Sequence, residues 1–193
     1  MIYKHKTQRV AILVDVQNLY YSAKNLYDSR INFKELLIAA TQGRQLVRAN
    51  AYVIRTDIYQ KEQEFFDALN KSGFDIKEKD LQIFAGGQKK GDWDVGIAMD
   101  MIRQAQKCDA IVLMSGDGDY IPVVNYVQQT FGVTVEVMSF GRSSSKALLE
   151  EADEFVDIEK NVDTFLFKKR KYVGSTTRTP VTPSSPALSP QVK

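Results

Sequence analysis

The chain of 193 residues has one cysteine, Cys108, and one histidine, His5. A single cysteine cannot form an intramolecular disulfide, and the two residues together cannot supply the ligands of a Cys/His zinc site. They also exclude a Ser-His or Cys-His catalytic pair in the core, because His5 stands in a charged N-terminal segment. Any chemistry must therefore come from carboxylates, hydroxyls, amides or cations.

The sequence also lacks a long apolar run. No segment approaches the roughly 20 apolar residues that cross a bilayer, and the N-terminal MIYKHKTQR lacks the apolar stretch of a signal peptide. The composition, 44% hydrophobic and 26% charged, is typical of a folded globular domain. We therefore expect one domain with a substantial core, a cytoplasmic location and no membrane partner.

Acidic side chains are missing from residues 168–193, which carry six basic ones. Since the whole chain has 26 basic and 24 acidic residues, residues 1–167 keep 20 basic against 24 acidic, a net charge of −4. Residues 174–193 hold four of the five prolines and many serines and threonines, which predicts a disordered tail. The sequence thus predicts a folded domain over 1–167, a basic segment over 168–173 that ends the last helix near Lys171, and a tail from Gly174. Such a basic segment can hold a polyanion that the acidic body would repel.

Short apolar runs alternate with segments of helical period along the body. The run RVAILVDV (9–16) is continuously apolar, as expected of a strand buried on both faces of a parallel sheet, and DAIVLMSGD (109–117) and VTVEVMSF (133–140) are similar. Helical segments of about 10 to 15 residues separate such strands. The pattern predicts an α/β fold with a mainly parallel sheet of about five strands and helices on both faces.

Aspartates follow the ends of predicted strands. Ligands of open α/β sheets bind outside the carboxyl ends of the strands, so these residues are expected to meet there. Asp94 comes instead from the start of a helix, where a carboxylate is favoured. The polar residues expected at this edge are Asp15, Asn18, Asp94, Ser115, Asp117 and Asp119.

Clustered carboxylates repel one another unless cations neutralise them or some are protonated. Mg²⁺ or Mn²⁺ is the usual partner of such a group, because both prefer oxygen ligands, and these ions can also coordinate a phosphate and activate water. The pattern therefore indicates metal-assisted phosphodiester hydrolysis. Two nearby aspartates are assigned other places: Asp92 is expected to cap the helix, and Asp100, about 240° around that helix from Asp94, is expected outside the metal site.

Four segments in order carry a family resemblance: AILVDVQNLYYSAK, KKGDWDVGIAMDMI, IVLMSGDGDYIPVVNYVQQTFGVTVEVMSF and SSSKALLEEADEFVDI. They resemble the motifs of the NYN domain, in its LabA-like branch, over about residues 8–160. The resemblance implies a three-layer α/β/α fold like that of PIN-domain nucleases. It also implies an acidic pocket that binds Mg²⁺ or Mn²⁺ and cleaves RNA.

The family's acidic positions match Asp15, Asp94, Asp117 and Asp119, and its polar partner matches Asn18. The family often has K-G-V-D where this chain has G-D-W-D, so the resemblance leaves open whether Asp92 or Asp94 reaches the metal.

We therefore expect an endoribonuclease that acts on single-stranded RNA with a divalent metal. The expected catalytic residues and metal ligands are Asp15, Asp94, Asp117 and Asp119. The expected substrate-binding residues are Asn18, Ser115, Lys89, Lys90 and Arg142.

Other functions fit parts of this pattern. A non-catalytic regulator could keep the fold and the metal pocket while binding RNA or a protein. A receiver-like phospho-acceptor would need a lysine at the end of the last strand, where the sequence reads VMSFGR, and an aspartate phosphatase would need D-x-D directly after the first strand. The sequence leaves a homodimer open and identifies no protein partner.

Overall fold

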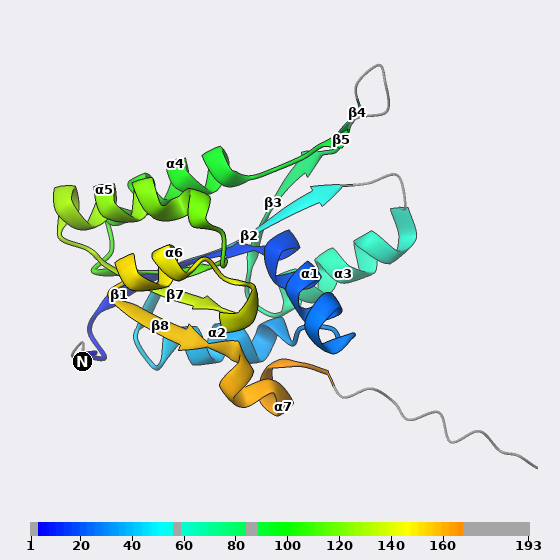
Figure 1. Cartoon of the computed structure of the whole chain (residues 1–193), viewed down its shortest axis with the longest axis horizontal. Helices are drawn as coiled ribbons and strands as arrows, with labels where there is room; N and C mark the ends of the chain where they lie inside the picture. The colour runs from blue at the N-terminus through cyan, green and yellow to red at the C-terminus, as the bar shows by residue number, and fades with distance from the viewer. Residues whose placement is uncertain (1–3, 56–58, 84–88, 168–193) are drawn as a thin grey trace, which may run out of the picture.

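The computed structural model describes residues 4–55, 59–83 and 89–167, and for residues 59–62, 82–83 and 89–90 it describes the backbone only. Its centre is a six-stranded sheet in the order β3-β2-β1-β6-β7-β8, in which every neighbouring pair is parallel (Figure 1). The strands are β1 (Arg9–Asp15), β2 (Gln45–Arg55), β3 (Asp75–Asp80), β6 (Ala110–Met114), β7 (Thr134–Ser139) and β8 (Glu154–Asp157). The sheet has one strand more than the five expected.

Helices cover both faces of this sheet, which confirms the three-layer fold. Figure 1 shows α4 and α5 on one side and α2 and α7 on the other. The helices on the α2 side are α1 (Val16–Tyr27), α2 (Phe33–Thr41), α3 (Tyr59–Lys71) and α7 (Val162–Phe165). Those on the α4 side are α4 (Asp94–Ala105), α5 (Ile121–Phe131) and α6 (Lys146–Glu151).

The core has two halves because β1 is buried on both faces. Val10, Ile12 and Val14 face the α2 side, while Ala11 and Leu13 face the α4 side, and all five are inaccessible to solvent. This alternation explains why the strand is a continuous apolar run in the sequence.

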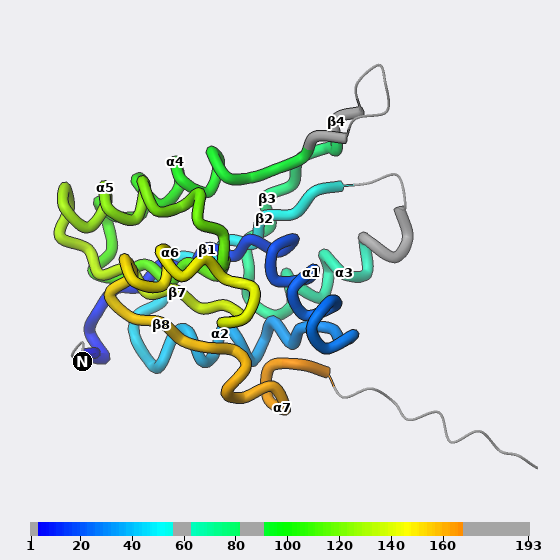
Figure 2. Tube along the Cα trace, viewed as in Figure 1, coloured from blue at the N-terminus to red at the C-terminus, as the bar shows by residue number. Residues whose placement is uncertain are grey.

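The chain reverses its direction of travel across the sheet between β1 and β6. From β1 it moves outward through β2 to β3, and from β6 it moves outward the other way through β7 to β8. Figure 2 shows β2 and β3 on one side of β1 and β7 and β8 on the other. Open α/β sheets bind their ligands at such a point, outside the carboxyl ends of the two strands, which are here β1 and β6. Asp15 is the last residue of β1, and Ser115 follows β6 directly.

Three shorter helical turns and a small hairpin complete the described structure. The turns are η1 (Gly118–Tyr120), η2 (Gly141–Ser143) and η3 (Ile158–Asn161). The hairpin pairs β4 (Gln82–Ile83) with β5 (Lys89–Lys90) in antiparallel fashion. No helix within the described ranges is both long and apolar enough to cross a membrane.

The prediction that the last helix continues to about Lys171 is wrong. The helix α7 ends at Phe165, and Leu166 is extended and forms an antiparallel bridge with Ile31. The backbone N–H of Phe167 then donates to the carbonyl of Arg30 at 2.8 Å. Pairing with a distant segment ends the helix, and the predicted basic segment and tail, 168–193, lie outside the described residues.

Candidate metal centre

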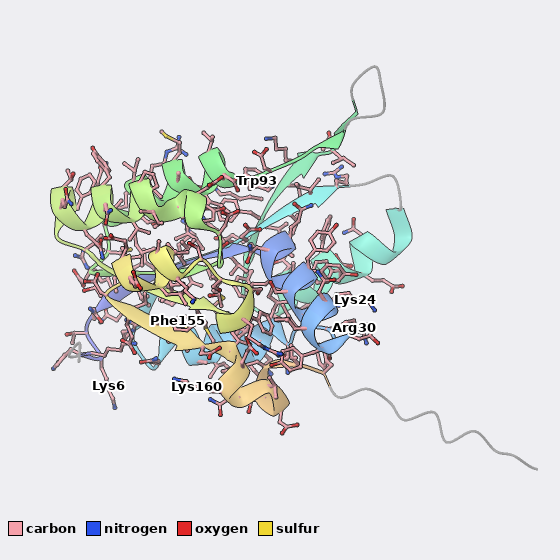
Figure 3. All side chains as sticks on the ribbon, viewed as in Figure 1. Lys6, Lys24, Arg30, Trp93, Phe155 and Lys160 are labelled. Atoms are coloured by element: carbon pink, nitrogen blue, oxygen red, sulfur yellow. The ribbon has the colours of Figure 1, made fainter. Side chains whose placement is uncertain are left out.

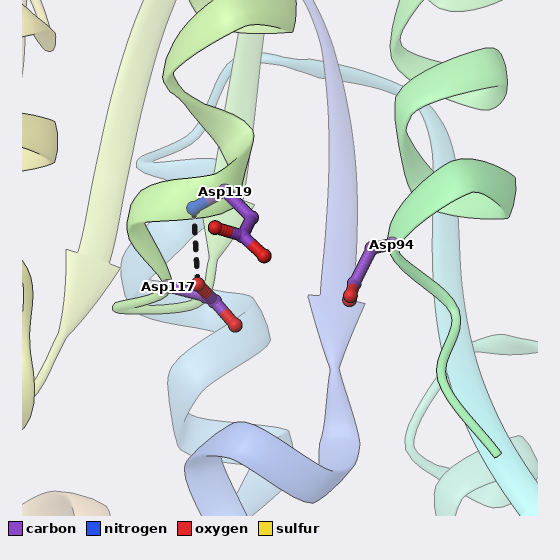
Figure 4. A group of neighbouring side chains, drawn as sticks. All are labelled: Asp94, Asp117 and Asp119. Carbon is purple, nitrogen blue, oxygen red and sulfur yellow. Dashed lines mark hydrogen bonds between the residues drawn. The ribbon is translucent and has the colours of Figure 1, made fainter. Parts of the chain in front are cut away.

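Three carboxylates meet near the carboxyl ends of β1 and β6. Asp94, Asp117 and Asp119 each offer one oxygen atom, and these three atoms lie within 4.8 Å of one another. Asp94 is the first residue of α4, and the other two belong to the turn that follows β6. Figure 4 shows Asp94 on one side of the end of β1 and the other two on the opposite side. The space between them suits a cation that prefers oxygen ligands.

Hydrogen bonds within the turn after β6 fix its conformation. The hydroxyl of Ser115 accepts from the backbone N–H of Asp117 at 3.3 Å. The carboxylate of Asp117 accepts from the backbone N–H of Asp119 at 3.0 Å, drawn as the dashed line in Figure 4. The turn therefore holds both acids in place, and it leaves the other oxygen of Asp117 free of that backbone bond.

Asp15 lies beside this group and is buried deeper. One of its carboxylate oxygens accepts from the backbone N–H of Asn18 at 3.1 Å and so caps α1. The other oxygen lies 3.4 Å from the hydroxyl of Ser115 and 3.4 Å from that of Tyr120. Asp15 is not one of the three carboxylates within 4.8 Å of one another, but it shares two of their neighbours.

Tyr120 joins the two parts of the site, and the sequence analysis did not identify it. Its side chain is buried, and its hydroxyl lies 3.2 Å from an oxygen of Asp94 in addition to its contact with Asp15. A phenol has one hydrogen, so it donates to one of the two carboxylates at a time. The motif SGDGDY contains this tyrosine directly after Asp119, and this position is the sequence feature that could have indicated its place in the site.

The electrostatics of the site favour neutralisation of the carboxylates. Burial raises the pKa of Asp15, and the charge of Asp94 adds to this, although the backbone N–H of Asn18 and the two hydroxyls oppose it. Burial also raises the pKa of Asp94, helped by the charges of Asp92, Asp117 and Asp119 and opposed by the hydrogen bond from Tyr120. Burial and the nearby carboxylates raise the pKa of the Tyr120 phenol, so it stays protonated. A bound cation would relieve the repulsion that these pKa shifts express.

Asn18 has a structural contact in addition to its predicted role. Its side-chain oxygen accepts from the backbone N–H of Gly116 at 3.0 Å, which ties α1 to the turn after β6. A Cβ atom on Gly116 would lie 2.3 Å from the hydroxyl of Ser144, so only glycine fits there without movement. The carbonyl of Gly116 accepts from the backbone N–H of Ser145 at 2.8 Å. The turn that carries two of the acids is thus packed between α1 and the loop before α6.

Asp92 does not cap α4, contrary to the prediction. Trp93 occupies the cap position and makes no side-chain capping bond. The indole N–H of Trp93, which Figure 3 labels near the start of α4, donates to the carbonyl of Val53 at 2.8 Å. This long-range bond fixes where the helix begins. Between the two acids of G-D-W-D, the structure brings Asp94 into the group of three.

The remaining predicted residues lie in different surroundings. Arg142 is engaged with Glu159, 2.5 Å away, and with the hydroxyl of Tyr27 at 2.8 Å. Lys89 and Lys90 form β5, but their side chains lie outside the described part of the chain. Asp100 is buried against other partners and is not in the group of three, as expected. The roles of all these residues in binding or catalysis stay predictions.

Comparison with known proteins identifies the family. The model of the NYN domain matches residues 9–159, which is most of the chain. The chain belongs to the NYN domain family. A relative of this NYN domain is the low amplitude and bright protein LabA of Synechococcus elongatus, 26% identical over 179 residues that cover 86% of this chain and 91% of LabA.

A solved structure supports the same fold. The crystal structure of VPA0982 from Vibrio parahaemolyticus, a protein of unknown function, is 37% identical to this NYN domain with a TM-score of 0.77. The match covers 86% of this chain and all of VPA0982. The α/β fold therefore agrees with a solved relative, and neither relative's name states a reaction.

Proposed function

We propose that this NYN domain is an endoribonuclease that uses Mg²⁺ or Mn²⁺ to hydrolyse phosphodiester bonds of single-stranded RNA in the cytoplasm. The observation that carries the proposal is the group of Asp94, Asp117 and Asp119, whose oxygen atoms lie within 4.8 Å of one another at the switch point of the sheet. Such an all-oxygen site suits a hard divalent cation. When bound, this metal supplies Lewis-acid stabilisation of phosphate oxygens and lowers the pKa of bound water.

The chain's own residues divide the remaining work. Asp94, Asp117 and Asp119 would hold the metal, and Asp15 would add a half-buried carboxylate beside them. Tyr120 stays protonated and donates its single hydroxyl hydrogen to either Asp94 or Asp15, one at a time. The hydroxyl of Ser115 and the amide of Asn18 would orient water or a phosphate oxygen, within the limits that their present hydrogen bonds set.

The experiment incubates the purified protein with labelled single-stranded RNA and Mn²⁺ or Mg²⁺, with and without EDTA. We expect internal cleavage that EDTA stops and that Asp117→Asn removes. The matched control is Asp163→Asn, which changes an exposed carboxylate of α7 and should cleave like the wild type. Full cleavage in excess EDTA, or by Asp117→Asn, would overturn the proposal.

A second measurement separates catalysis from metal binding alone. Mn²⁺ at about 100 times its Kd should stabilise the fold by about 2.7 kcal/mol by mass action, and Asp117→Asn should lose the resulting rise in melting temperature. A metal-dependent rise without any RNA cleavage would contradict the nuclease and favour a non-catalytic regulator that keeps the pocket.

A further inference from the structure

A second polar feature lies along α4, away from the acidic group. It is a cavity of about 470 Å³ between the second half of α4 and the first residues of β2 and β3. Asp100 and Arg103 line it and follow Asp94 by six and nine residues, which is roughly 9 and 14 Å along a helix that rises about 1.5 Å per residue. The cavity and the acidic group therefore share one helix as a wall.

The lining of this cavity is positively charged. It contains four cations, Arg48, Lys77, Arg103 and Lys107, against two carboxylates, Asp75 and Asp100. This surplus of two positive charges stands out in a body whose net charge is −4. The cavity is thus a place where the body would attract a polyanion instead of repelling it.

One buried carboxylate organises two of the cations. Asp100 accepts from Lys77 at 2.5 Å, from Arg103 at 3.0 Å and from the hydroxyl of Tyr52 at 2.7 Å. Burial tends to raise the pKa of Asp100, but these donors and their charges outweigh it and lower the pKa, so the carboxylate stays ionised. A single negative charge thus holds two positive ones at the cavity wall.

The other two cations are less tightly held. Arg48 pairs with Asp75 at 2.6 Å, with both side chains more than half exposed, and such exposed pairs contribute little. Lys107 has no ion pair within the ranges that the structure describes. Both cations can therefore turn to a new anionic partner at small cost.

A further lysine connects the cavity with the acidic group. Lys79 and Lys77 are two residues apart on β3 and so point to the same face of the sheet. Lys79 donates to the carbonyl of Asp92 at 3.0 Å and lies 5.9 Å from the ring of Trp93, the residue before Asp94. Cations therefore extend from the start of α4 to its end on one face of the molecule.

We propose that these five residues, Lys79, Lys77, Arg103, Arg48 and Lys107, form a phosphate track that binds the backbone of single-stranded RNA on one side of the acidic group. The inference rests on the proposed function. The track extends beyond the roughly 14 Å of helix between Asp94 and Arg103, so it fits successive phosphates of one strand better than a single small anion.

The test changes the two loosely held cations together, as Arg48→Gln with Lys107→Gln. These two leave the buried Asp100 with its donors, so the fold should be kept. The matched control, Lys34→Gln with Lys160→Gln, removes the same charge from exposed sites on α2 and η3. Fluorescence anisotropy in EDTA follows binding of labelled RNA of about 20 nucleotides and about four nucleotides over a range of salt.

We expect the slope of log affinity against log salt for the longer RNA to fall by up to about 1.4 in the track variant, at about 0.7 for each phosphate contact. The control variant should keep the wild-type slope, and the shorter RNA, which presents fewer phosphates to the track, should lose less of its slope in the track variant than the longer RNA does. An unchanged slope, or an equal loss in the control, would overturn the track. Cleavage of the four-nucleotide RNA with Mn²⁺ is measured separately, so failure of the nuclease proposal is distinguished from failure of the track.

Discussion

Asp15 combines a structural role with an electrostatic cost. Its carboxylate caps α1 through the backbone N–H of Asn18, while burial and the charge of Asp94 raise its pKa. A carboxyl whose folded pKa is raised lowers the free energy of unfolding as the pH rises past its unfolded pKa, and the loss is complete above its folded pKa, where the folded state holds a disfavoured charge. The sequence predicted that Asp15 belongs to the acidic edge, but the depth of its burial depends on packing that no local pattern encodes.

We expect Asp15→Asn to stabilise the metal-free protein at neutral pH and to abolish RNA cleavage. Asparagine keeps an oxygen for the cap and removes the charge, since Asn and Asp are equally good cap residues. The gain in melting temperature should shrink as the pH falls through the folded pKa of Asp15, where the wild-type carboxyl becomes neutral. Thermal melts across an acid-to-neutral pH series check this, and a stability loss of equal size at every pH would contradict it.

Individual residues of the site differ in whether the sequence predicts their position. The spacing of SGDGDY placed Asp117 and Asp119 together because a turn directly after a strand must lie at its carboxyl end. Tyr120 was missed because its role depends on reaching two carboxylates from two other segments, Asp15 and Asp94. Local patterns predict which residues stand at an edge, and tertiary packing decides which of them meet.

At the scale of elements, the start of α4 separates the two acids of G-D-W-D. Aspartate is a common helix N-cap residue, so the sequence favoured Asp92 as the cap. The hydrogen bond from the indole of Trp93 to the carbonyl of Val53 instead places the start of the helix at Asp94. We expect Asp92→Ala to change the free energy of unfolding by less than about 0.5 kcal/mol, since the side chain caps nothing. Loss of a true cap costs about 0.5 to 2 kcal/mol.

Asp94→Ala should instead remove the rise in melting temperature that Mn²⁺ produces, together with cleavage. Urea unfolding and metal titration of both variants check this contrast. If Asp92→Ala lost the metal effect and Asp94→Ala kept it, the ligand would be Asp92, and the described geometry would not be the metal-bound one.

The close packing of two loops supplies another test at this scale. A Cβ on Gly116 would lie 2.3 Å from the hydroxyl and 2.9 Å from the backbone Cα of Ser144, whereas a Cβ on Gly118 would lie 2.9 Å from the hydroxyl of Ser145. A hydroxyl can rotate away, but backbone must shift. We expect Gly116→Ala to cost about 1 to 3 kcal/mol, as overpacking does, and to weaken metal binding by moving Asp117.

Gly118→Ala is the matched comparison, because it adds the same methyl group to the same turn. It should be less destabilising than Gly116→Ala in urea unfolding and should keep more of the Mn²⁺-induced rise in melting temperature. Equal losses in both variants would mean that contact with the Ser144 backbone does not set the position of the turn.

For the whole molecule, the sequence predicted the architecture well and its edges poorly. Continuous apolar strands such as β1 can only be buried on both faces, which requires two helical layers. The sixth strand, β8, is only four residues long and all four are half-buried. Its sequence, EFVD, therefore contains too short an apolar run to predict a strand clearly. The helix α7 ends early because Leu166 bridges Ile31, a contact between segments more than a hundred residues apart.

The place where the described chain ends bears on how the whole molecule could hold RNA. Phe167 is half exposed, its N–H bonds to the carbonyl of Arg30, and its ring lies 5.8 Å from the guanidinium of that residue. Arg30 follows the C-terminal end of α1, whereas the acidic group lies near the start of that helix. The described chain therefore ends near the far end of α1, roughly 18 Å along that helix from the acidic group, whereas the phosphate track lies along α4.

Two separate groups of cations should contribute independently to binding. Changing Lys168, Lys169, Arg170 and Lys171 to Ala should lower the salt slope for long single-stranded RNA by up to about 3, at about 0.7 for each phosphate. Combining this variant with Arg48→Gln and Lys107→Gln should give the sum of the two losses, because each phosphate contact contributes its own counterion release to the slope. Truncation before Gly174 removes only two basic residues, Arg178 and Lys193, and should change the salt slope far less. Anisotropy titrations over a range of salt check all three, and an unchanged slope in the four-alanine variant would assign the affinity for RNA to the body alone.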